Sequence, residues 1–472
     1  MISFALLRVL RGSVLALATI PFALASAQSA YVVGPNVQVT HADSGRAVQE
    51  TYICADPRDA RHLVAAAIIE RGDTTANAFF VSFDRGVSWR QTLLLNQGVD
   101  PSCAISAEGV ALAAGVRDSL PSGTSYLNVL RSRDGGRTWT ESVVHRSIPS
   151  LDRPYVTSGL NGHFWIHGYV QAPRAADGTR TPAVAVLYAS SDFGRAFDRV
   201  TVLPGTAFPT PWFFPANGIA TADGTFIGLV VELDNTQRNM FRGRSDSASA
   251  PHSANGELRV IRSRNRGLVE TSRISSAYYD WRVPQLSMSA LAVDRSTGPF
   301  RGRLYAAWPD ARYGGRTQIL LSHSDDTGHT WSAARVVSDG PDTLGFGPNN
   351  FMPMVAVSRT GAVGLSWYDR RDSSDSLSYV ARFRASRDGG DSWLPSVQVS
   401  REPNRLKPTD RHLNGGDTSG LAVDADGRFH LVWIDNRTGV AQAWTASVEV
   451  AGAGQVRTRR PLGSVPRPAT ER

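Results

Sequence analysis

The feature that most limits the fold of this chain is an octapeptide with the pattern Ser-x-Asp-x-Gly-x-Ser/Thr-Trp. Clean copies begin at residues 82, 132, 324 and 386, and two worn copies begin at residues 190 and 263. Successive copies therefore lie 50 to 73 residues apart. A period in this range is typical of propeller blades or of another repeat array.

Each copy is predicted to be a turn between two strands. Its Asp can accept hydrogen bonds from the turn backbone, its Gly can adopt a positive φ, and its aromatic residue can cover the turn. Apolar residues precede the first copy at 78–81, and a further strand pattern follows it at 90–94. We therefore expect a structural role for the Asp residues of five copies: Asp84, Asp134, Asp192, Asp326 and Asp388.

Two further strands are predicted before each copy, as at 286–293 and 303–308. Four strands per unit form the blade of an all-β propeller. We place six blades between residues 48 and 402 and a seventh unit at 412–450, with a six-bladed ring as the alternative. The seventh unit lacks a fourth strand, and segment 36–40 matches 396–400, the fourth strand of blade 6. An N-terminal strand is therefore expected to complete the last blade and close the ring.

The two ends of the chain have other predicted roles. Residues 1–27 combine Arg8 and Arg11, an apolar run at 14–24 and an Ala-Ser-Ala site, the pattern of a secretory signal peptide. A secreted or periplasmic protein is expected, with an N-terminal anchor helix as the alternative. No later segment has the roughly 18 apolar residues of a membrane helix. Residues 28–450 are expected to form the propeller, and the basic segment 451–472 is predicted to be disordered.

The net charge of +8 does not indicate a nucleic-acid partner. Lys407 is the single lysine, and the arginines are spread along the chain rather than clustered on one element. Cys54 and Cys103 are the two cysteines. If both occupy inner strands of adjacent blades, export makes a disulfide between them plausible, and two separate buried thiols are the alternative. Two cysteines without neighbouring histidines do not form a zinc site.

The octapeptide resembles the Asp-box, or bacterial neuraminidase repeat, of the sialidase-like family, and the resemblance extends over nearly all of the mature chain. It implies a propeller that acts on anionic carbohydrate without a cofactor. Residues Trp281 to Pro284 read Trp-Arg-Val-Pro and are similar to the family signature Phe/Tyr-Arg-Ile-Pro. That similarity implies that Arg282 binds a substrate carboxylate. The acid/base position of the same blade holds 314–317 without a carboxylate, and Asp375 has the comparable place in blade 6.

Loops between strands 2 and 3, and between successive blades, share one face of a propeller, which we call the mouth. The pattern Trp-x-Asp-x-Arg occurs three times in the first set, at 308–312, 367–371 and 433–437. Either these residues surround a ligand, for which a guanidinium suits a carboxylate, or they tie loops together. The loops between blades do not repeat. The candidate catalytic residues are Tyr279, Asp280, Asp310 and Asp375, and the candidate binding residues are Arg153, Trp212, Arg282, Arg312, Arg371, Arg411, His412 and Arg437.

Three functional hypotheses follow. The first is an exported glycoside hydrolase of exo-sialidase type, in which Tyr279 or a carboxylate attacks and an Asp protonates the leaving oxygen. The second is a uronate polysaccharide lyase that uses His412. The third is a non-catalytic propeller that binds a glycan or a protein at its mouth. A monomer without a bound metal is expected in each case.

Overall fold

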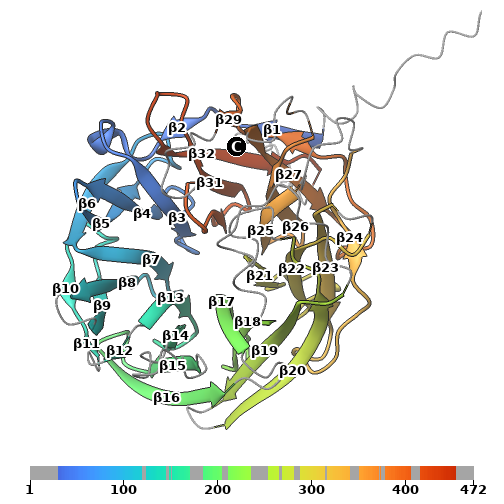
Figure 1. Cartoon of the computed structure of the whole chain (residues 1–472), viewed down its shortest axis with the longest axis horizontal. Helices are drawn as coiled ribbons and strands as arrows, with labels where there is room; N and C mark the ends of the chain where they lie inside the picture. The colour runs from blue at the N-terminus through green and yellow to red at the C-terminus, as the bar shows by residue number, and fades with distance from the viewer. Residues whose placement is uncertain are drawn as a thin grey trace, which may run out of the picture.

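The computed structural model describes residues 30–119, 124–144, 148–149, 151–170, 184–204, 211–234, 253–264, 268–280, 288–313, 316–340, 350–371, 373, 378–405 and 415–452. These residues form a ring of seven antiparallel sheets (Figure 1). The prediction of an all-β propeller is confirmed, and so is the count of seven blades. Four predicted site residues, Arg282, Asp375, Arg411 and His412, lie outside the described residues, as do the predicted signal peptide and the tail from residue 453.

The first three blades follow the predicted order of strands from the axis outward. Blade 1 contains β3 (Val48–Ala55), β4 (Leu63–Arg71), β5 (Thr74–Ser82) and β6 (Arg90–Asn96). Blade 2 contains β7 (Gly98–Ile105), β8 (Ala111–Ser119), β9 (Thr124–Ser132), β10 (Thr140–Glu141) and β12 (Ile148–Pro149). Blade 3 contains β13 (Leu151–Ser158), β14 (Phe164–Val170), β15 (Val184–Ser190) and β16 (Ala196–Pro204), with β11 (Val143–Val144) added in parallel to β16.

The next three blades repeat this order. Blade 4 contains β17 (Pro211–Ala220), β18 (Phe226–Asp234), β19 (Gly256–Arg264) and β20 (Leu268–Ala277). Blade 5 contains β21 (Ala290–Val293), β22 (Leu304–Asp310), β23 (Gln318–Ser324) and β24 (Arg335–Val336). Blade 6 contains β25 (Asn350–Val357), β26 (Val363–Asp369), β27 (Ser378–Ser386), β28 (Val397–Gln398) and β29 (Asn404–Arg405).

Blade 7 closes the ring with strands from both ends of the chain. Its own strands are β30 (Gly420–Val423), β31 (Phe429–Asp435) and β32 (Gln442–Val450), and its outer strands are β1 (Tyr31–Val33) and β2 (Val37–Gln38), which pair with β32. A short 3-10 helix, η1 (His41–Asp43), leads into blade 1. Tyr31 fastens the closure, because its hydroxyl accepts a 3.0 Å hydrogen bond from the amide of Ala385 and its ring meets Phe383 edge-on. The predicted N-terminal strand thus completes the last blade.

The octapeptide copies link third strands to fourth strands, as predicted. In the copy of blade 2, Asp134 accepts hydrogen bonds from the amide (2.9 Å) and the hydroxyl (2.6 Å) of Thr138. Gly136 has a φ of +82° and donates its amide to the hydroxyl of Ser132. The turn also reaches the preceding blade, because His62 contacts the carbonyl oxygen of Gly135 at 2.9 Å. These turns therefore join blades as well as strands.

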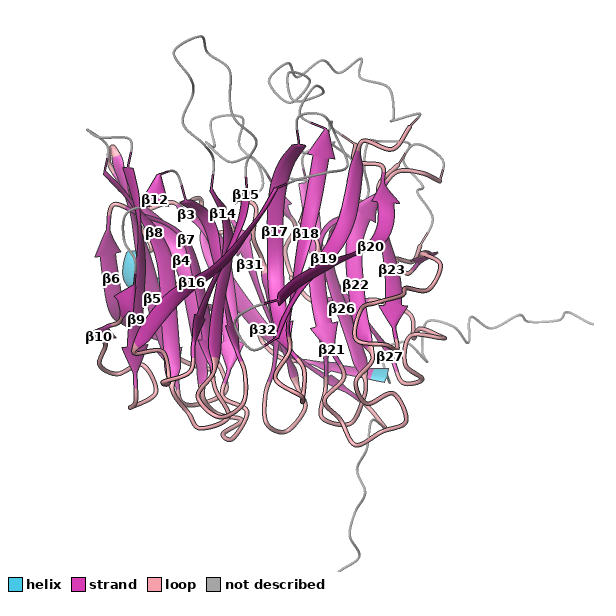
Figure 2. Ribbon diagram, turned by 90° about the horizontal axis from the view of Figure 1, so that it is seen from below, coloured by secondary structure: helices cyan, strands magenta, loops and turns pink. Residues whose placement is uncertain are grey.

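The strands run between two faces of the ring, and loops gather at both ends (Figure 2). The first strand of each blade lies nearest the axis and the later strands lie progressively farther out (Figure 1). Buried apolar side chains fill the layers between neighbouring blades, and Trp308, Trp367 and Trp433 are among the largest fully buried ones. In the described part of the chain, no helix has the length and apolar character needed to cross a bilayer.

Candidate functional site at the axis of the ring

The three Trp-x-Asp-x-Arg motifs form internal brackets at the ends of β22, β26 and β31. Their carboxylates belong to Asp310, Asp369 and Asp435, which are at most 1% exposed. Each accepts a hydrogen bond from the indole of its own Trp, at 2.9, 2.8 and 3.4 Å. Each also accepts the backbone amide of the Arg two residues later, at 2.9, 2.8 and 2.8 Å. Each of these Asp carboxylates is therefore hydrogen-bonded to donors of its own loop.

The guanidiniums of these brackets also have second partners. Arg312 donates to the hydroxyl of Ser275 in β20 at 3.2 Å and lies over the ring of Tyr278. Arg371 pairs with Asp339 at 3.0 Å. Arg437 donates to the side chain of Asn36 at 3.1 Å. These contacts are those expected if the motif ties loops together.

Tyr279 and Asp280 are inside the wall between blades 4 and 5, and each is 1% exposed. Asn255 accepts the amide of Tyr279 and donates to its carbonyl oxygen, both at 2.8 Å. Burial raises the pKa of the Tyr279 hydroxyl well above its usual value. Trp212 pairs in the backbone with Leu233, and its side chain lies outside the described residues. Tyr279 and Asp280 therefore lie apart from the charged residues around Arg153.

Five of the innermost strands share a β-bulge, at which one extra residue interrupts the pairing with the second strand of the blade. The pairing register shifts at this point in β3, β7, β13, β17 and β25. Glu50, Asp100, Arg153 and Met352 occupy this position with φ of 51°, 54°, 53° and 51°. A positive φ is uncommon for a residue other than Gly and indicates a local strain that the rest of the fold supports.

Each remaining blade has a residue in the equivalent place. It lies two residues before the backbone pair that corresponds to the first pair after the bulge in the other blades. In blade 4 the register gives Ala216. In blade 5 this pair is Ala290 with Ala307, and the residue two positions earlier is Met288. In blade 7 the pair is Gly420 with Val432, and the residue is Thr418. We call these seven residues the bulge ring: Glu50, Asp100, Arg153, Ala216, Met288, Met352 and Thr418. The ring is polar on blades 7, 1, 2 and 3 and apolar on blades 4, 5 and 6.

Arg153 contacts residues of several other blades. Its guanidinium pairs with Asp417 of blade 7 and donates a 2.8 Å hydrogen bond to the sulfur of Met288 in blade 5. It also lies 4.7 Å from the centre of the Phe214 ring in blade 4. Its backbone amide donates to Asp100 at 3.1 Å. Because Arg153 is only 8% exposed, its charge depends on these partners rather than on water.

Four carboxyl groups surround this guanidinium, and we call Glu50, Asp100, Asp152 and Asp417 the acid cluster. Burial raises the pKa of Glu50, the charges of Asp417 and Asp100 raise it further, and Arg153 partly offsets them. Burial also raises the pKa of Asp100, and the neighbouring Asp152 adds to the effect. Repulsion between close carboxylates has this effect because one negative charge disfavours the next. Glu50 and Asp100 therefore retain a proton at higher pH than ordinary carboxyl groups.

Several polar atoms around the acid cluster are buried without a hydrogen-bond partner among the described residues. They are one carboxylate oxygen each of Glu50 and Asp417 and the hydroxyls of Tyr155 and Thr418. The charges of Arg153, Asp417 and Asp100 all act on Tyr155, which places its hydroxyl at the cluster. Buried polar atoms normally have partners, so this group of atoms is suited to binding a polar ligand.

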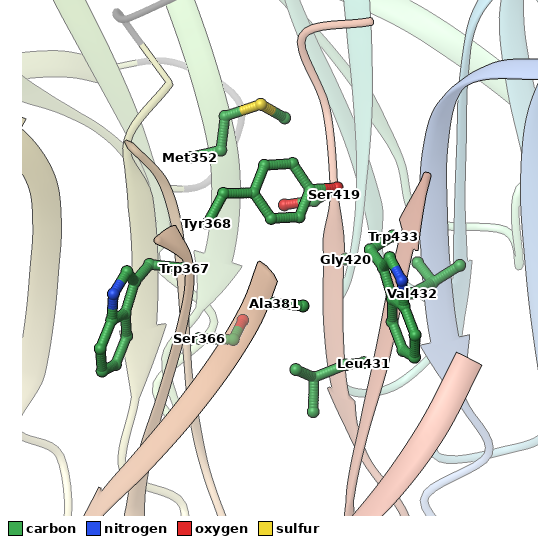
Figure 3. Close-up of a pocket in the computed structure, with 10 residues that line it drawn as sticks. All are labelled: Met352, Ser366, Trp367, Tyr368, Ala381, Ser419, Gly420, Leu431, Val432 and Trp433. Carbon is green, nitrogen blue, oxygen red and sulfur yellow. The ribbon is translucent and has the colours of Figure 1, made fainter. Parts of the chain in front are cut away.

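A recess borders the bulge ring between blades 6 and 7. Its empty volume is about 210 Å³, open solvent at its mouth included, and Met352, Tyr368 and Ser419 are among its lining residues. Figure 3 shows the side chain of Tyr368 directed toward Ser419, with Met352 beside it. Met352 of the bulge ring therefore also lines this recess.

Sequence patterns did not identify Glu50, Asp100 and the bulge ring. The sequence did predict Arg153 as a binding residue. Asp152 precedes it in β13, and Asp417 lies in the segment that leads into β30. Cys54 on β3 and Cys103 on β7 lie close together. Burial raises the pKa of the Cys54 thiol, and a hydrogen bond with the Cys103 side chain raises it further. Both are reduced thiols in this structure, and the disulfide stays a prediction.

No protein-family model and no curated protein matches the chain. Similar solved structures include a protein of unknown function from Dyadobacter fermentans DSM 18053, at 12% identity and a TM-score of 0.46, over 89% of this chain and 99% of that one. The Hadza microbial sialidase Hz136 has 15% identity and a TM-score of 0.44, over 83% and 74%. The GH93 α-L-arabinofuranosidase of Fusarium graminearum has 11% identity and a TM-score of 0.45, over 89% and 97%. In its repeated octapeptide and its four-stranded blades, the chain resembles the sialidase-like propellers.

Proposed function

We propose that the protein is a glycoside hydrolase whose reacting centre is the acid cluster. The observation that supports this function is the interacting pair of carboxyl groups of Glu50, which is buried, and Asp100, which is half-buried, whose pKa values are both raised. Glycoside hydrolysis generally needs one carboxyl group that still holds a proton near neutral pH and a second carboxylate that attacks or activates water. Both types of group are present at the axis.

The burial of the four carboxyl groups suggests which one donates a proton and which one attacks. The Glu50–Asp100 pair gives its proton to the glycosidic oxygen as the bond to the anomeric carbon breaks. Because the two groups interact, the proton belongs to the pair rather than to one residue. Asp152 has a side chain that is 30% exposed, against 15% for Asp417, which pairs with Arg153. We assign to Asp152 the carboxylate that attacks the anomeric carbon or takes a proton from the attacking water.

The division of the bulge ring into a polar half and an apolar half supports a sugar ligand. Its polar half offers carboxylates and hydroxyls, whereas Ala216, Met288 and Met352 form an apolar half. A sugar ring has hydroxyl groups at its edge and C–H groups on its faces, so it can use both halves. Export from the cell, predicted from the first 27 residues, would bring the protein to extracellular or periplasmic glycans.

An anionic glycan would need arginines that are not already paired within the protein. The predicted binding residues Arg312, Arg371 and Arg437 pair with the Asp residues of their own loops, and Arg153 pairs with Asp417. An anionic glycan, as expected from the sequence, would therefore depend on Arg282 and Arg411, which lie outside the described residues.

The hydrolase proposal is tested with the mature protein and fluorogenic glycosides of neutral, amino and acidic sugars, together with uronate polysaccharides. Glu50→Gln and Asp152→Asn should each lower kcat by about 100-fold or more, because acid–base groups contribute about 10²–10⁴. Asp73→Asn is the matched control, because Asp73 lies exposed in the turn between β4 and β5. Circular dichroism confirms folding of each variant.

Two outcomes would contradict the proposal. Unchanged kcat in Glu50→Gln and Asp152→Asn would remove the acid cluster from the reaction. Absence of turnover for the whole panel, together with measurable binding of a glycan, would identify a non-catalytic binding propeller. Formation of unsaturated products from uronate polysaccharides would favour the lyase hypothesis.

A further inference from the structure

We propose that the acid cluster binds the ammonium group of an amino sugar, so that the preferred glycan is cationic at this position. This inference rests on the proposed function for the location of the sugar but concerns recognition rather than hydrolysis. It starts from the balance of groups at the axis, where, within the described residues, the four carboxyl groups of Glu50, Asp100, Asp152 and Asp417 face the guanidinium of Arg153.

The hydrogen-bond pattern calls for additional donors. Arg153 binds one oxygen of Asp417, and the other oxygen of that carboxylate is buried without a partner among the described residues. One oxygen of Glu50 is in the same condition, although Glu50 is only 6% exposed. An ammonium group has three donors and no acceptor, so it can supply what both carboxyl groups lack.

A second observation locates the ligand group. The hydroxyl of Tyr155 is buried without a partner in the described part of the chain, and it is subject to the charges of Asp417 and Asp100. Tyr155 itself is 5% exposed, and Thr418, at 8%, has an equally unpartnered hydroxyl. Hydroxyls can accept from an ammonium or donate to a sugar oxygen. The groups that would contact the amine thus come from blades 7, 1, 2 and 3.

Other ligand charges fit this position less well. A carboxylate or sulfate would add negative charge to a cluster whose guanidinium already has a partner, and close like charges repel strongly where water is excluded. For a metal ion, the described residues contain no group of three or more His, Cys, Asp or Glu side chains arranged to hold one. An amine needs only directed acceptors, which the cluster offers.

The inference predicts that binding releases a proton. The groups that face Glu50 and Asp100 are Asp152, Arg153 and Tyr155 from β13 and Asp417 from blade 7. A cation among them stabilises the ionised carboxylates and therefore lowers their pKa. Because their raised pKa values keep a proton on the pair, and that proton must leave for full charge pairing, affinity for the amine should rise with pH until the ammonium group itself loses its proton.

The test compares two tetrasaccharides of equal length by isothermal titration calorimetry with the mature protein. One is a β-1,4-linked glucosamine oligomer with free amines, and the other is its fully N-acetylated form. We expect at least tenfold tighter binding of the free amine at about pH 6, where the ammonium group keeps its proton, and proton release detected as a dependence of the heat on buffer. Asp417→Asn should remove most of this preference, whereas the exposed control Asp73→Asn should retain it.

The comparison of the two ligands needs no variant, so a failure of Asp417→Asn to fold does not remove the test. Equal affinity for both tetrasaccharides, tighter binding of the acetylated form, or binding of neither at millimolar concentration would overturn the inference. Turnover is measured separately. A protein that hydrolyses other glycosides without preferring the amine contradicts this inference alone, whereas one that prefers the amine without any turnover contradicts the hydrolase proposal alone.

Discussion

Replacing Arg153 by Met tests whether the axial charges are mutually dependent. Arg153→Met keeps an unbranched apolar stem and removes the guanidinium that pairs with Asp417, contacts the sulfur of Met288 and lies over Phe214. Asp417 then stays partly buried without its cationic partner. Breaking a buried pair from one side destabilises a protein by about 3–5 kcal/mol, because an uncompensated charge remains. We expect a loss of this size at pH 8.

The loss should depend on pH in a defined direction. Arg153 opposes the raised pKa of both Glu50 and Asp100, so its removal raises these values further. A carboxyl group whose folded pKa lies above its unfolded value of about 4 destabilises the fold increasingly as pH rises through that interval. The variant should therefore be close to the parent at pH 4 and least stable, relative to the parent, at pH 8.

Urea unfolding is the better assay for this variant. Unfolding entropy is about 2.1 cal/mol/K per residue, which for 472 residues makes 1 kcal/mol correspond to a melting shift of only about 1 °C. The double variant Arg153→Met with Asp417→Asn should recover most of the loss, and Arg90→Met, at an exposed site, should have little effect. Equal destabilisation at pH 4 and pH 8, or no recovery in the double variant, would refute the reasoning.

Two further predictions concern the scaffold. Although burial raises it, hydrogen bonds from Thr138 and Ser132 hold the pKa of Asp134 at about 2. Because Asp134 is largely exposed, we discount the shift for solvent screening and expect Asp134→Asn to cost about 1 kcal/mol at pH 7, with the difference lost as pH falls from about 4 toward 2 in denaturant unfolding. For the predicted disulfide, peptide mapping of non-reduced exported protein should find Cys54 linked to Cys103, and two alkylatable thiols would show that the pair stays reduced.

Much of the fold was predictable from the sequence because its signals are local. The turn chemistry of residues 82–89 and its copies needs only Ser, Asp, Gly and Trp at fixed spacing, and the two-residue periodicity of the strands needs only neighbouring residues. The closing strand was predictable from the likeness of 36–40 to 396–400. The pattern at 308–312 also located its buried Asp and Arg, although sequence alone left their role open.

The axial site could not be predicted in the same way. No glycine marks the bulges at Glu50, Asp100 or Arg153, although each has a positive φ. Pro101 and Pro154 follow two of these residues, but a proline alone does not show that a strand contains a bulge. Only the tertiary fold joins segments near residues 50, 100, 153 and 417 around one axis. The raised pKa values of Glu50 and Asp100 arise from that arrangement, because burial and the repulsion between carboxyl groups exist only after the ring closes. The sequence by itself determined the blades, and the closing of the ring determined which charges meet.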